Sequence, residues 1–61
     1  MRITSVRLED GTKEIHLSIN DMTDGRQEIS ININEPGSFQ NVRLSTAAAR
    51  AIAEVMLRMT E

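Results

Sequence analysis

Cysteine, tryptophan and tyrosine are absent from this 61-residue chain, which has one phenylalanine, one proline and three glycines. The lack of cysteine excludes a disulfide framework and a thiolate metal site. Residues 1–61 can form at most one domain, and a domain of this length buries only about 60% of its unfolded surface. Because such a core gives marginal stability, self-association would be a direct way to bury more apolar surface.

Neither sign of charge dominates, since seven Lys and Arg oppose nine Asp and Glu and leave a net charge of −2. This mixture argues against a strongly basic nucleic-acid-binding module. The first ten residues contain no apolar signal segment, and no stretch is long and apolar enough to span a membrane. We therefore expect a cytoplasmic protein without a membrane partner, such as a small bacterial or phage accessory protein.

Alternating apolar and polar residues predict short β-strands over the first two-thirds of the chain. The predicted strands are Arg2–Leu8, Lys13–Asn20, Arg26–Asn34 and a shorter Phe39–Leu44. This alternation is typical of strands with one buried face and one solvated face. The fourth segment is expected to fold back on the third strand, although it could instead run as a loop or pair with the first strand.

Glycine-containing turns predict how the strands are paired. Asp10–Gly11 is a strong hairpin signal, and as a two-residue loop it places Val6 opposite Ile15 and Arg7 opposite Glu14.

The next two turns predict the remaining register. A three-residue loop at Thr23–Gly25, with its glycine in the left-handed position, places Leu17 opposite Ile31. The Glu35–Ser38 turn has proline second and glycine third, as such turns favour, and it places Val42 opposite Ile31.

The segment Ser45–Met59 has a clear helical period and is rich in alanine, the best helix former. Ser45 or Thr46 can cap its first turn with a hydroxyl oxygen. Polar residues gather on one side, where Glu54 and Arg58 form a favourable pair. The opposite side carries an apolar stripe of Ala48, Ile52, Val55, Met56 and Met59.

Beside this stripe, Ala49, Ala53 and Leu57 form an apolar flank. Stripe and flank together span roughly 200° of the helix, whereas packing on one sheet face asks for about 100° or more. One interpretation is that the alanines merely favour helix formation. The other is that the flank binds a second copy or another protein.

These elements predict an α+β fold, a single ββ(β)βα domain over residues 1–61. A small antiparallel three- to four-stranded meander carries one C-terminal helix packed on one face. The expected core lies between this face and the helix and consists of Val6, Leu8, Ile15, Leu17, Ile19, Ile29, Ile31, Ile33, Val42, Leu44, Ile52, Val55, Met56 and Met59.

The opposite, outer face of the sheet is a second candidate binding surface. Its candidate binding residues are Arg7, His16, Ser30, Asn32 and Arg43. The simpler interpretation is an ordinary solvated sheet face. By strand alternation, Ile3 and Phe39 also fall on the outer face. Each is therefore either turned inward by a bulge or an exposed contact.

No set of residues predicts catalysis, a metal site or a cofactor. His16 is the only histidine, and a catalytic histidine needs an orienting acid and a nucleophile or substrate within reach. A metal site needs several convergent His, Cys or carboxylate ligands. The acidic residues near the hairpin ends are explained by turn chemistry. We therefore expect a protein that is not an enzyme.

The order of several strands and one closing helix, with a strand running into a capped helix at NVRLSTAAARAI, is similar to the single-stranded-DNA-binding transcriptional coactivator family. The resemblance covers the whole chain as topology. It implies a dimer formed through the helices, with sheets that grip an extended strand. The chain departs from that pattern because it is acidic and has one aromatic residue, whereas base stacking usually uses several.

Two functions follow as hypotheses. The first is a small non-enzymatic interaction protein that acts by protein–protein contact, as a homodimer or an inhibitor-like regulator. The alternative is a weak single-stranded nucleic-acid-binding module that uses the outer sheet face, although the net charge disfavours it.

Overall fold

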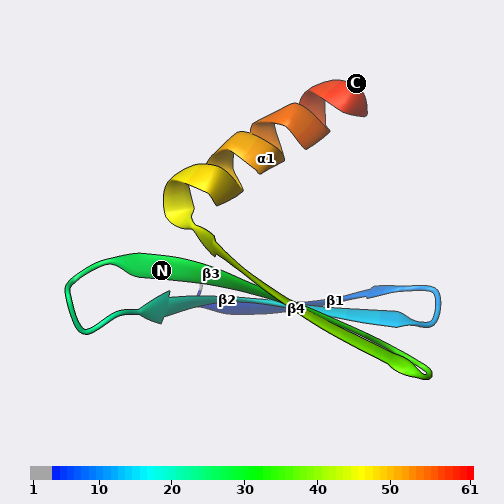
Figure 1. The fold of residues 1–61 in the computed structure, drawn as a ribbon. Coiled ribbons are helices and arrows are strands. Elements are labelled where there is room, and N and C mark those ends of the chain that lie inside the picture. Colours follow the sequence, from blue (N-terminus) through cyan, green and yellow to red (C-terminus); the bar gives the residue numbers. More distant parts are fainter. Residues whose placement is uncertain (1–3) are drawn as a thin grey trace.

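The computed structural model describes residues 4–61 and consists of a four-stranded antiparallel sheet followed by one helix (Figure 1). Its elements are β1 (Ser5–Asp10), β2 (Lys13–Asp21), β3 (Gln27–Glu35), β4 (Ser38–Ser45) and α1 (Thr46–Met59). The strand order is β1-β2-β3-β4, so each strand pairs with the next one in sequence. The predicted α+β class and meander are confirmed, and the fourth strand pairs with the third.

Two of the three predicted hairpin registers are confirmed. Leu17 lies opposite Ile31, which in turn lies opposite Val42 on β4. Gly25 and Gly37 have φ angles of 87° and 80°, as the predicted turns require of a glycine.

The first hairpin differs from the prediction, because its loop is Gly11-Thr12 rather than Asp10-Gly11. Val6 therefore lies opposite Leu17 rather than Ile15. Gly11 has a φ of 62°, and no other kind of residue among 4–61 has a positive φ. A loop with glycine first avoids the positive φ that Asp10 would otherwise adopt. The shift is two residues, so each side chain keeps its predicted face.

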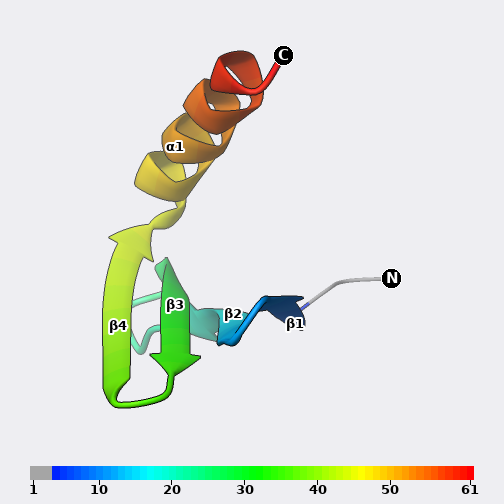
Figure 2. The ribbon, with the colours of Figure 1, turned by 90° about the vertical axis from the view of Figure 1, so that its right-hand side faces the viewer.

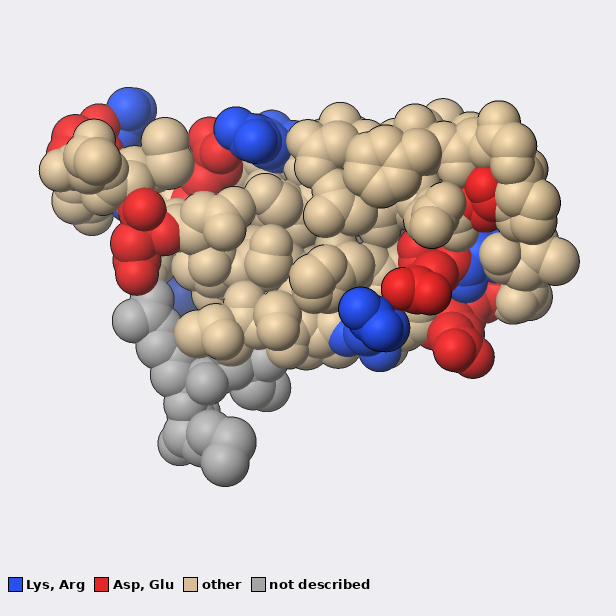
Figure 3. Space-filling view, turned by 90° about the horizontal axis from the view of Figure 1, so that it is seen from below, with Lys and Arg blue, Asp and Glu red and all other residues tan. Residues whose placement is uncertain are grey.

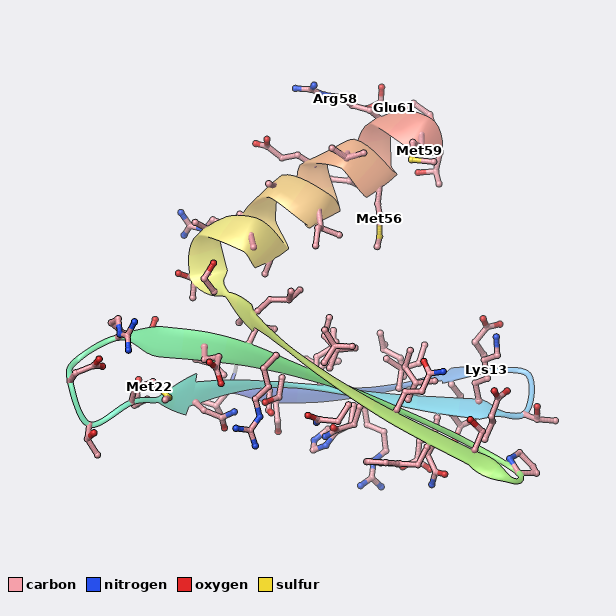
Figure 4. All side chains as sticks on the ribbon, viewed as in Figure 1. Lys13, Met22, Met56, Arg58, Met59 and Glu61 are labelled. Atoms are coloured by element: carbon pink, nitrogen blue, oxygen red, sulfur yellow. The ribbon has the colours of Figure 1, made fainter. Side chains whose placement is uncertain are left out.

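The alternation gives the sheet one apolar face, which we call the inner face because it lies toward α1 (Figure 4). Its apolar residues form three cross-strand rows, which contain Val6, Leu8, Ile15, Leu17, Ile19, Ile29, Ile31, Ile33, Val42 and Leu44. The other side, the outer face, carries most of the polar strand residues, whereas Asp10, Lys13 and Gln40 lie at inner-face positions. The sequence pattern thus places the apolar side chains as predicted.

Helix α1 begins directly at the end of β4. Ser45, the last residue of the strand, is the N-cap, and its hydroxyl oxygen accepts a hydrogen bond from the Ala48 amide at 3.2 Å. The helix rises from the sheet at this end, so that its C-terminus lies far above the strands (Figure 2). Within residues 4–61, the backbone of α1 lies close to β3 and β4 and not to β1 or β2.

This arrangement leaves the chain without a closed core. No hydrophobic side chain among residues 4–61 is buried, so the predicted core residues share a face but do not enclose one another. The radius of gyration is 12.9 Å, whereas a compact chain of this length has about 10.5 Å. The prediction of a monomeric core is wrong because the helix meets the sheet only near its own N-terminus.

Candidate functional site

The inner face over β1 and β2 is an apolar surface that residues 4–61 do not cover. Leu8 on β1 is 48% exposed, and Val6, Ile15 and Leu17 are only half-buried. These residues adjoin one another in two neighbouring rows, with Val6 opposite Leu17 and Leu8 opposite Ile15. A continuous exposed apolar patch of this kind usually marks an interaction surface.

The apolar stripe of α1 is a second uncovered surface, and its exposure increases along the helix. Ile52 is 41% exposed, Val55 52%, Met56 58% and Met59 78%. In Figure 4, Met56 extends from the helix toward the sheet across the open space between them. The helix therefore presents apolar side chains that touch little of their own chain.

The predicted partner-binding flank begins beside the sheet and ends away from it, because the helix rises from the sheet. Ala49 is half-buried and Ala53 is exposed, and both line a recess beside Ile19 and Ile29 where α1 leaves the sheet. Leu57 lies one turn farther on and is 65% exposed. All three side chains thus remain at least partly accessible to a partner.

The five outer-face candidates lie together in two adjacent rows. Arg7 is opposite His16, which is opposite Asn32, and in the next row Ser30 is opposite Arg43. The structure therefore brings all five residues onto one surface.

Several of these polar groups are occupied by neighbours on the same sheet. Ser30 is only 6% exposed, and its hydroxyl accepts a hydrogen bond from Asn20 Nδ2 at 2.7 Å. The side-chain Nδ2 of Asn41 donates a hydrogen bond to the side-chain Oδ1 of Asn32. Arg7 Nε lies 3.2 Å from Glu14 Oε1, a diagonal ion pair rather than the directly opposed pair that the sequence predicted. Such internal pairing leaves fewer polar groups for a ligand.

Among residues 4–61, the outer face carries no large patch of one charge. Figure 3 views this side of the molecule, where uncharged residues predominate and basic and acidic groups lie interspersed. Phe39 lies opposite Asn34 and is 65% exposed, so it is an exposed contact and not a side chain turned inward. Ile3 lies outside the described residues. One exposed aromatic is a small platform for base stacking.

This surface leads to a prediction about nucleic acid. Titration of the protein with labelled single-stranded oligonucleotide at low ionic strength is expected to show no salt-sensitive binding. The net charge is −2, and Arg7 is already paired with Glu14, so few phosphates would be neutralised. Binding that weakens with salt and is lost in an Arg7→Ala, Arg43→Ala double variant would contradict this prediction.

Residues 4–61 contain no recognisable metal-binding set, and His16 has no directly opposed partner suited to catalysis. The cross-strand neighbours of His16 are Arg7 and Asn32, neither of which supplies an orienting carboxylate or a nucleophile. No group of three or more His, Cys, Asp or Glu residues in this part of the chain could hold a metal ion.

The fold and its surfaces define a small α+β protein in which the sheet and the helix each present an uncovered apolar face. No family model, curated protein or solved structure matches the chain. The helix of residues 4–61 is too short and too polar to cross a membrane.

Sequence reasoning assigned the β1–β2 half of the inner face to the core and so missed it as a candidate site. The width of the predicted sheet is the signal that could have identified it, because one helix covers only part of four strands.

Proposed function

We propose that this protein is a small non-enzymatic interaction protein that acts by protein–protein contact as a homodimer. The observation that carries the proposal is the absence of any buried hydrophobic side chain in residues 4–61. Burial of apolar surface is the dominant favourable contribution to folding. A chain that buries so little on its own is expected to gain the rest from a partner.

The accessible surface supports the same proposal quantitatively. The chain exposes 5270 Å², whereas a compact monomer of 6.8 kDa exposes about 4,000 Å². The difference, about 1,300 Å², exceeds the roughly 800 Å² that each partner buries in a standard stable interface. Covering it would restore the burial that a single domain of this size normally achieves.

The apolar character of both uncovered surfaces favours contact with a protein. The stripe on α1 is aliphatic and methionine, and the β1–β2 half of the inner face is mainly aliphatic, with the charged Asp10–Lys13 pair at its end. Obligate dimer interfaces have this composition, because they resemble a domain core divided between two chains. The role as a regulator follows as a hypothesis, since a dimer without a catalytic set would act through what it binds.

Sedimentation equilibrium at two protein concentrations tests the homodimer. We expect a mass of twice the chain's 6.8 kDa, and a thermal midpoint that rises with protein concentration because dissociation accompanies unfolding. A strictly monomeric mass at high concentration, with a midpoint independent of concentration, would overturn the proposal.

A further inference from the structure

The inner face is wider than the one helix that the chain places on it. Four strands at about 4.8 Å spacing form a face roughly 19 Å wide, whereas a helix with its side chains is about 10 Å across. Helix α1 contacts β3 and β4 only. The half of the inner face formed by β1 and β2 therefore has room for a second helix, which residues 4–61 do not supply.

The chain's own helix is poorly placed to close over that half. Ser45 is both the last residue of β4 and the N-cap of α1, so no linker separates strand from helix. Ser45 is held on one side by its pairing with Glu28 and on the other by the hydrogen bond from Ala48. Moving α1 over β1 and β2 would break the cap or the end of the strand pairing, which costs free energy.

We propose that the helix of a second copy occupies this position, so that α1 of each chain lies on the β1–β2 half of the other chain's inner face. This inference rests on the proposed homodimer and specifies its interface. Under a two-fold axis, the uncovered stripe of each helix meets the uncovered half of the partner's sheet, and the same contact occurs twice.

A second copy fits better than an unrelated protein because the two uncovered surfaces complement each other. One is a helix stripe of Ile52, Val55, Met56 and Met59, and the other is a sheet surface about one helix wide. If each copy covers its excess of about 1,300 Å², the dimer buries roughly 2,600 Å², which lies in the range of obligate homodimers.

Methyl nuclear Overhauser spectroscopy on a mixed sample tests this exchange of helices between the two copies. One batch of protein is labelled at the methionine methyl groups and the other at the methyl groups of Ile, Leu and Val; the two are unfolded together and refolded. We expect cross-peaks between chains from Met56 and Met59 to Val6, Leu8, Ile15 and Leu17. Met22, in the loop between β2 and β3 (Figure 4), is the internal control and should show none to these four residues.

Other outcomes would overturn the exchange in distinguishable ways. Interchain cross-peaks confined to Ile52 and Val55 would indicate helix–helix pairing without coverage of the partner's sheet, and the homodimer would stand. In a separate sample whose chains carry both labels, a Met56–Leu8 cross-peak that is absent from the mixed sample would show that the helix covers its own sheet. A monomeric mass in the sedimentation experiment would overturn both the exchange and the homodimer.

Discussion

Replacing Ile31 with alanine is expected to lower the free energy of unfolding by about 2–5 kcal/mol, the cost of truncating a fully buried isoleucine. Ile31 lies at the centre of the inner face, opposite Leu17 and Val42. In the single chain it is only half-buried, so truncation there would remove fewer contacts and cost less. A full core effect is expected only if a partner completes the burial of this face.

Urea unfolding followed by circular dichroism, at one fixed protein concentration, measures this difference. Asn34→Ala is the matched control, because Asn34 is an exposed residue on the outer face of the same strand. We expect the control to change the free energy of unfolding by no more than about 0.5 kcal/mol. If Ile31→Ala cost as little as Asn34→Ala, the inner face would remain open in solution.

The double substitution Ala53→Glu, Leu57→Glu is expected to weaken dimerisation by at least about a hundredfold, which corresponds to roughly 2.7 kcal/mol. Both residues lie on the apolar flank of α1, and Leu57 is 65% exposed in the single chain. A carboxylate buried there without a partner would pay a large desolvation penalty. Glutamate is a good helix former, so the helix itself should persist.

The control for this experiment changes the charge equally on the polar side of the same helix. Ala47→Glu with Arg58→Gln also lowers the net charge by two, and Ala47 and Arg58 are both exposed. Sedimentation velocity should show monomer for the first variant and dimer for the control. A dimeric mass for Ala53→Glu, Leu57→Glu would remove the flank of α1 from the interface.

How far the sequence predicts this fold can be judged from individual hairpins. At the β2–β3 loop, a two-residue turn would have put isoleucines opposite polar residues, so the apolar pattern favoured the three-residue loop, whose register the structure has. At the first hairpin, Asp10-Gly11 and Gly11-Thr12 loops both keep apolar residues on one face. Alternation cannot separate registers that differ by two residues. The observed loop keeps Gly11 at a positive φ and spares Asp10 that conformation.

The candidate surfaces were predicted unevenly for a related reason. Residue parity was sufficient to gather Arg7, His16 and Asn32 on one face, because strand geometry fixes the side on which each residue lies. Their bonding was not predictable, since the Arg7–Glu14 contact is diagonal and depends on the register. The apolar surface of the helix was likewise predicted, but its degree of exposure was not.

By itself, the sequence determined the order of the elements, the face on which each strand residue lies, and the excess apolar arc of the C-terminal helix. These are local properties, set by the two-residue period of strands and the 3.6-residue period of helices. Only the tertiary structure decided where the helix points after Ser45 and which strands it covers. That direction depends on the geometry of one capped junction, and an apolar pattern specifies what must be covered without specifying what covers it.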